Sequence, residues 1–144
     1  MLTRAELCAR LPHAGGMCLI DALVGWDAQH LAARATSHRD PANPLRHDGR
    51  LSALTGIEYA AQAVALHGSL LAGDDAPRAG FLASVRDVRC DVERLDTCAA
   101  PLELRVERLG GDVDGMIYHF AIHSGDQPLL SGRLTIRLLP GVAP

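Results

Sequence analysis

The residues best suited to chemistry lie in the stretch TGIEYAAQA, residues 55–63, within the most apolar helical segment of the chain. Glu58 stands in its middle, and Gln62 follows one helical turn later. Burial among Leu and Ile side chains raises the pKa of a carboxyl group, which suits a general acid near neutral pH. We therefore predict that Glu58 is a catalytic acid whose rotamer Gln62 holds. The alternative is an interface or capping carboxylate, satisfied by an arginine or by backbone N–H groups.

The helix predicted over residues 52–72 is apolar around almost its whole circumference, which is typical of a buried helix. Its polar exceptions recur at offsets that return to one narrow face: Thr55, Glu58, Gln62 and Ser69. A polar stripe on a buried helix must point to a cleft, to a subunit interface or to polar partners.

The remaining sequence predicts the elements that position this helix. A short helix is expected over residues 3–11, with Thr3 and Glu6 forming a capping box. A loop with two prolines covers residues 38–50. Strands are expected at 17–26, 30–37, 80–92, 101–109, 114–124 and 127–139. The order predicts one α+β domain over residues 1–144, with an antiparallel sheet of five to six strands curled around the long helix.

Composition narrows the function. The 144 residues carry a net charge of −3, which gives no argument for a nucleic-acid partner, and all 14 basic residues are arginine. No secretory signal or membrane-spanning run is recognised, so a cytoplasmic location without a membrane partner is expected. The four cysteines lack metal or CxxC spacing, so we predict that their thiols are reduced and serve in packing: Cys8, Cys18, Cys90 and Cys98.

Two histidines, His119 and His123, have HxxxH spacing, but on a strand this spacing spans about 13 Å. That is too far to chelate one ion, so no metal site is predicted. His67 on the helix and His13 after the first helix are expected to be structural.

The segment GRLSALTGIEYAAQAVALHG, residues 49–68, resembles the central helix of hot-dog-fold 3-hydroxyacyl-acyl-carrier-protein dehydratases. That family carries a Glu or Asp followed by Ala-x-Ala-Gln. The LPH at 11–13 and the MCLID at 17–21 also match the family's opening Leu-Pro-His and apolar-Asp strand, and the order of elements agrees over nearly the whole chain. The sequence is most similar to the dehydratase-like proteins of aryl-polyene pigment clusters.

The resemblance implies dehydration of 3-hydroxyacyl-carrier-protein thioesters to trans-2-enoyl thioesters in fatty-acid or polyene synthesis. Glu58 matches the acid that protonates the departing hydroxyl. Backbone N–H groups at the helix start, at Ala53, Thr55 and Gly56, together with Gln62, would bind the substrate. No cofactor is expected, because the phosphopantetheine arrives on the substrate.

The family's catalytic histidine lies 14 residues before the carboxylate, where this chain has Pro44. The candidate bases are therefore His38 and His47, and the alternative is that both are solvated loop histidines. The same loop holds three arginines that would contact an acidic carrier protein: Arg39, Arg46 and Arg50.

Two further hypotheses remain open. The chain is a weakly active or inactive subunit that completes a heterodimer with an active homologue, or it is a hot-dog acyl thioesterase. The family also implies pairing in a homodimer or a heterodimer whose sites lie at the subunit interface.

Overall fold

The computed structural model describes residues 2–11, 17–73 and 80–139. Two α-helices and six strands lie in these ranges, together with two short 3-10 turns. The helices are α1 (Arg4–Ala9) and α2 (Gly56–Ala72). The turns are η2 (Ser37–Arg39) and η3 (Ala53–Thr55). The strands are β1 (Ala22–Trp26), β2 (His30–Ala35), β3 (Gly80–Cys90), β4 (Leu102–Gly111), β5 (Gly115–Ser124) and β6 (Gln127–Leu138).

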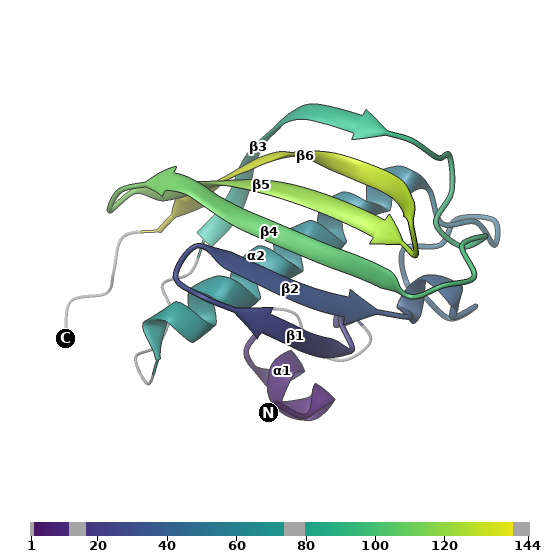
Figure 1. Cartoon of the computed structure of the whole chain (residues 1–144), viewed down its shortest axis with the longest axis horizontal. Helices are drawn as coiled ribbons and strands as arrows, with labels where there is room; N and C mark the ends of the chain where they lie inside the picture. Colours follow the sequence, from purple (N-terminus) through teal and green to yellow (C-terminus); the bar gives the residue numbers. More distant parts are fainter. Residues whose placement is uncertain (1, 12–16, 74–79, 140–144) are drawn as a thin grey trace.

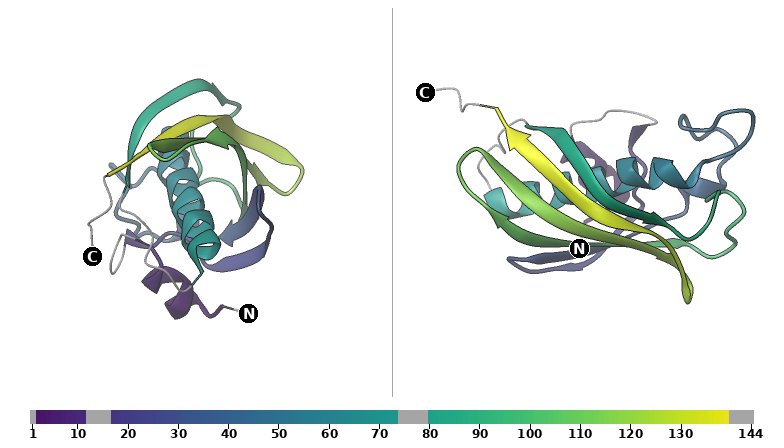
Figure 2. Two further views of the ribbon diagram at one scale, coloured as in Figure 1. Left: turned by 90° about the vertical axis from the view of Figure 1, so that its left-hand side faces the viewer. Right: turned by 90° about the horizontal axis from the view of Figure 1, so that it is seen from above.

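The strands form one antiparallel sheet in the order β1-β2-β4-β5-β6-β3. Figure 1 shows this sheet curved over α2, and Figure 2 shows α2 running through the hollow of the curve. Along β4, Leu102, Leu104 and Val106 are buried toward the helix, while the residues between them face outward. The alternation buries one face of the sheet against α2. The predicted α+β architecture is confirmed.

The ends of the predicted elements differ from the structure at two places that matter for the site. The predicted helix over 52–72 begins as the 3-10 turn η3, because the Ser52 hydroxyl accepts the N–H of Leu54 and caps it. The predicted strand over 17–26 joins the sheet only at Ala22. Residues 17–20 lie outside the sheet, and their backbone groups bond to side chains of other elements instead.

The predicted N-terminal capping box is present, since Thr3 and Glu6 exchange hydrogen bonds of 3.1 and 3.2 Å. In Figure 1, α1 lies below β1, at the opposite end of the sheet from β3. Among the described residues, no helix combines the length and the apolar character needed to cross a membrane.

Candidate active site

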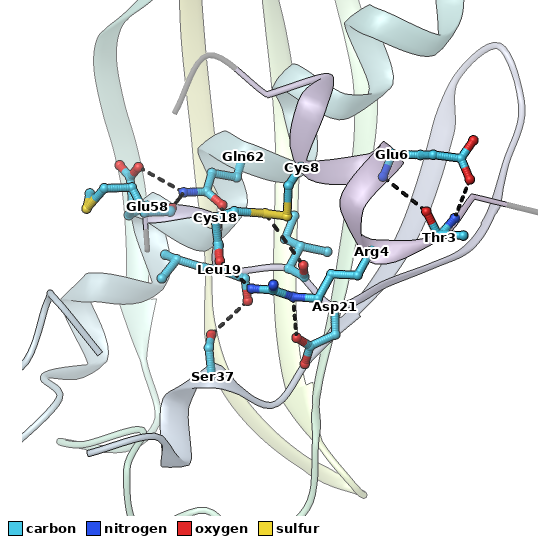
Figure 3. Close-up of a disulfide and its surroundings, with 12 residues drawn as sticks. Thr3, Arg4, Glu6, Cys8, Cys18, Leu19, Asp21, Ser37, Glu58 and Gln62 are labelled. Atoms are coloured by element: carbon cyan, nitrogen blue, oxygen red, sulfur yellow. Dashed lines mark hydrogen bonds and ion pairs between the residues drawn. A yellow bond between two sulfur atoms is a disulfide. The ribbon is translucent and has the colours of Figure 1, made fainter. Parts of the chain in front are cut away.

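Glu58 lies in the first turn of α2 and is partly buried. The Gln62 side chain, one turn further along, donates from Nε2 to Glu58 Oε1 at 3.3 Å. Figure 3 shows the two side chains on the same face of the helix, as their i, i+4 spacing requires. The predicted contact is therefore present.

Gln62 is itself held on both sides of its amide, and its side chain is 1% exposed. Its Oε1 accepts the N–H of Leu19 at 2.9 Å, and its Nε2 donates to the Met17 carbonyl at 2.6 Å. One oxygen and one nitrogen can satisfy these partners in only one orientation. The backbone on either side of Cys18 therefore fixes the amide that contacts Glu58.

The polar stripe of α2 faces the N-terminal part of the chain. Gln62 meets the backbone of residues 17–19, and the Ser69 hydroxyl accepts from Arg10 Nη1 at 3.1 Å. The stripe was expected to point to a cleft, to a subunit interface or to polar partners. At Gln62 and Ser69 it meets polar partners within the same chain.

Cys8 and Cys18 form a disulfide, so the prediction of four reduced cysteines was wrong for this pair. The bond joins α1 to the segment that holds Gln62 (Figure 3). Arg4 supports the same segment, because its Nη2 donates to the Cys18 carbonyl at 3.1 Å and its Nε contacts Asp21 at 3.3 Å. Spacing alone gave no signal for the pairing, since it depends on how α1 folds back.

A chain of hydroxyl groups connects this segment to the loop before the helix. Ser37 Oγ donates to the Leu19 carbonyl at 2.7 Å, so the hydroxyl of Tyr59 donates to Ser37 Oγ, also at 2.7 Å. The buried Asn43 side chain donates to Tyr59 Oη at 3.1 Å and to the Ser37 carbonyl at 2.9 Å. These bonds fasten the loop over residues 37–43 to the helix residue next to Glu58.

His38 lies in η2 and is fully buried, which contradicts the solvated alternative for this residue. Its Nε2 lies 2.9 Å from the Cys98 carbonyl, which can only accept, so Nε2 carries the proton. Nδ1 is left unprotonated and has no hydrogen-bond partner among the described residues. Burial lowers the pKa of His38 below its ordinary value, which keeps the ring neutral.

His47 is in the opposite situation. Its side chain is 93% exposed and lies 3.5 Å from Asp48, which is also exposed. The two candidate bases therefore differ sharply, because one is a neutral ring in the core and the other is the solvated loop histidine of the alternative hypothesis.

The N–H groups at the start of the helix already have partners within the chain. Ala53 donates to the Glu93 carbonyl at 2.9 Å, Thr55 donates to Ser52 at 3.0 Å, and Gly56 donates to the Ala53 carbonyl. A role for these N–H groups in polarising a thioester stays a prediction. It would require one of these backbone hydrogen bonds to be shared with the substrate or broken.

Gly56 has a packing role that its sequence position did not reveal. A Cβ atom there would lie 2.6 Å from Leu130 Cδ2 and 3.1 Å from Ile122 Cδ1. Glycine thus allows the start of α2 to lie directly on β5 and β6, and this close approach fixes the depth of Glu58 relative to the sheet.

The loop arginines are partly used by the loop itself. Arg46 donates to the carbonyls of Gly49 and His38 at 2.7 and 3.1 Å, and Arg39 donates to the Ala99 carbonyl at 3.0 Å. Arg50 is exposed. The carrier-contact role stays a prediction, and Arg46 would have to break loop bonds to perform it.

His67 is fully buried, and both of its ring nitrogens have partners within the chain. Its Nε2 donates to the Asp27 carbonyl at 2.8 Å, so Nδ1 accepts from the Tyr118 hydroxyl at 2.6 Å. Burial raises the pKa of Tyr118 to about 12, which keeps that hydroxyl protonated. His13 lies outside the described residues.

Two hollows of about 530 and 300 Å³ lie on the outer face of the sheet. The larger is bordered by Trp26, His30 and Glu107, and the smaller by Arg89 and His123. Neither is lined by Glu58. The strongest candidate for chemistry therefore stands apart from both hollows, on the helix face covered by the N-terminal segment.

Comparison with known proteins places this geometry in context. The family model described as ApeP dehydratase, ApeP-like, matches residues 5–139. No curated protein matches the sequence. Among solved structures, the dehydratase heterocomplex ApeI:P from Xenorhabdus doucetiae contains a chain that superposes with a TM-score of 0.82 at 24% identity, covering 93% of this chain and 91% of that one.

Thioesterases share the same fold at lower identity. Thioesterase HI1161 from Haemophilus influenzae has a TM-score of 0.67 at 13% identity, with 96% of this chain and 92% of that chain covered. A mutant of thioesterase PA1618 from Pseudomonas aeruginosa has a TM-score of 0.66 at 15% identity, with 98% and 96% covered. The six-stranded sheet around one long helix is thus the predicted hot-dog fold.

Proposed function

Because the chain belongs to the ApeP-like dehydratase family, we propose that it takes part in dehydrating 3-hydroxyacyl thioesters on an acyl carrier protein to trans-2-enoyl thioesters. The supporting observation within the chain is Glu58, a partly buried carboxylate whose position is set by the doubly held Gln62.

In the proposed reaction, a base removes the α-proton of the substrate and a carbon–carbon double bond forms. The bond from the β-carbon to its hydroxyl breaks, and protonated Glu58 transfers its proton to the departing oxygen, so that water leaves. Gln62 donates to Glu58 and keeps the carboxyl group in one rotamer. No cofactor is needed, since the phosphopantetheine belongs to the carrier protein.

His38 is the better of the two histidines as the base, because its Nδ1 is unprotonated and has no partner among the described residues. It is also fully buried, so the loop over it must move before a substrate can reach Nδ1. A base contributed by a second subunit is the alternative source.

We further propose that the chain pairs with a related dehydratase through the β3 edge. One side of β3 pairs with β6, and β3 is the last strand of the sheet. Phe81, Leu82 and Val88 on it are 53%, 39% and 37% exposed. A long edge strand with exposed apolar side chains is a template for pairing with another chain, and the matched Xenorhabdus chain comes from a heterocomplex.

The test compares the chain alone with the chain co-purified with a homologous dehydratase, each given a 3-hydroxyacyl carrier protein. We expect an enoyl product detected by mass spectrometry. Glu58→Gln should lower the rate by at least about 10²-fold, because it removes the proton donor while keeping the shape of the side chain.

The His38→Gln variant identifies the base. Loss of activity in this variant, alone and in the pair, supports His38 as the base. If the variant keeps full activity when paired with the homologous dehydratase, the base belongs to the partner. Release of free thiol without an enoyl product would instead support the thioesterase alternative, which is favoured by the fold shared with thioesterases. The absence of both products from the chain and from the pair would refute the proposal.

A further inference from the structure

The disulfide between Cys8 and Cys18 lies at a position where it can act on the proposed acid. Cys18 stands between Met17 and Leu19, and these two residues supply both backbone partners of the Gln62 amide. Gln62 in turn donates to Glu58. A single covalent bond is therefore separated from the carboxylate by one residue of backbone and one side chain (Figure 3).

The other end of the bond is attached to an anchored element. Cys8 belongs to α1, whose Leu7 is fully buried in the core and whose first turn is capped by Thr3 and Glu6. The segment at residues 17–20 has no strand partner of its own, because it lies outside the sheet. Leu19 and Ile20 pack in the core, and the disulfide, Arg4 and the side chains of Gln62 and Ser37 fix the backbone of the segment.

We propose that the Cys8–Cys18 disulfide is a positioning element for Glu58, and that its reduction by a dithiol loosens Gln62 and lowers the rate of the proposed reaction. The kinetic part rests on the proposed function. The structural part, the coupling between the disulfide and Gln62, does not.

The reduction is ordinary thiol–disulfide exchange. A thiolate of the dithiol attacks Cys8 Sγ, which belongs to a partly exposed residue, and the Cys18 thiolate leaves and takes up a proton. The second thiolate of the reductant then displaces Cys8, which also takes up a proton. The reductant becomes a disulfide and the protein gains two thiols. Disulfides are rare in reducing compartments, where those present are commonly redox-sensing.

The other two cysteines provide an internal control. Cys90 is exposed, and Cys98 is partly buried. Burial raises the pKa of the Cys98 thiol, which makes it a poor nucleophile. After denaturation, the oxidised protein should take up two alkyl groups, at Cys90 and Cys98, and the reduced protein four. Four groups on protein purified without reductant and air-oxidised would overturn the proposal.

Glutamine labelling measures the coupling directly. The chain has three glutamines, Gln29, Gln62 and Gln127, so protein labelled with ¹⁵N-glutamine gives three side-chain amide pairs. Upon reduction with dithiothreitol, we expect the Gln62 amide protons to exchange roughly tenfold faster or more. The amides of Gln29 and Gln127 should not change. Unchanged Gln62 exchange would overturn the inference, whether or not the protein is a dehydratase.

Kinetics test the positioning role. In a Cys90→Ser background, reduction should lower kcat about tenfold while KM stays within about twofold, because the loss concerns orientation of the acid and not substrate binding. Reoxidation should restore kcat. Cys8→Ser should reproduce the reduced state without added reductant. Equal kcat in both redox states would overturn the positioning role. If neither state is active, alone or paired with the homologous dehydratase, the proposed function fails and the glutamine experiment alone decides the coupling.

Discussion

Glu58 is held through a relay of defined hydrogen bonds. The carboxylate accepts from Gln62, whose amide is fixed by the Met17 carbonyl and the Leu19 N–H. Removing a side chain that satisfies two buried backbone groups costs the desolvation free energy of each of them. The residues that position the acid are therefore also residues that stabilise the fold, and activity must be read together with stability at these positions.

Gln62→Ala illustrates this coupling. The substitution leaves the Met17 carbonyl and the Leu19 N–H without their side-chain partner, so we expect the free energy of unfolding to fall by about 1–3 kcal/mol. Urea denaturation followed by circular dichroism measures the change. Glu58→Gln is the matched control, because it keeps the Gln62 contacts with the backbone, and it should unfold within about 0.5 kcal/mol of the wild type. Equal stability of Gln62→Ala and the wild type would contradict the relay.

His38 makes stability depend on pH. Its pKa is lowered by burial in the folded chain, whereas in the unfolded chain it takes the ordinary value of about 6.5. Between these two values the unfolded state binds more protons, so the stability present above about pH 6.5 is lost as the pH falls through the folded pKa.

Unfolding measured from about pH 7.5 to about pH 5 should therefore show a loss of stability that His38→Gln lacks. His47→Gln is the control, because its side chain is 93% exposed, and it should follow the wild type. A parallel loss of stability in His38→Gln and the wild type would show that His38 is not the group responsible.

At the scale of elements, the start of α2 is set by packing against the sheet. Gly56 lies against Leu130 and Ile122, and both of these side chains are buried. The small side chains of Gly56 and of the many alanines let the helix lie close to the sheet. It also means that the position of Glu58, two residues later, depends on a glycine that carries no chemistry.

Two glycines of the same helix give a matched pair of substitutions. Gly56→Ala places a Cβ 2.6 Å from Leu130 Cδ2, so we expect a loss of about 1–3 kcal/mol from overpacking. Gly68→Ala meets nothing within 4 Å, so it should stabilise the helix by up to about 1 kcal/mol. Thermal denaturation of both variants checks the signs, and a stabilised Gly56→Ala would contradict the close packing.

The elements were largely predictable from the sequence, and their long-range contacts were not. Periodicity and the spacing of Glu58 and Gln62 reflect local geometry, so the buried helix and the contact within it could be read directly. The 3-10 turn before Gly56 depends on the Ser52 cap and on the carbonyl of Glu93, which belongs to a distant segment. The Cys8–Cys18 bond and the burial of His38 likewise arise only when separated segments meet.

At the scale of the whole molecule, the two edges of the sheet differ. The β1 edge lies near α1, while β3 at the other edge is 11 residues long and carries Phe81, Leu82 and Val88 on the surface. The proposed pairing uses the β3 edge because it is the longer of the two and offers more backbone groups for augmentation.

A valine on each edge tests this choice. Val88→Lys on β3 should weaken association with the homologous dehydratase roughly tenfold or more, because a charge enters the interface. Val24→Lys on β1 changes a residue that is 53% exposed at the opposite edge and should leave association unchanged. Sedimentation of mixed subunits measures both. The reverse result would assign the interface to β1.

The open β3 strand also has a consequence for how much of this protein a cell should make. A copy without a partner displays eleven residues of edge strand with several apolar side chains, and such strands invite self-association and aggregation. For the proposed pair, balanced synthesis of the two subunits would then limit aggregation. We expect overproduction of this chain alone to yield aggregates, and coexpression of the proposed partner to reduce their amount. The ratio of the two gene products would then control the solubility of this chain.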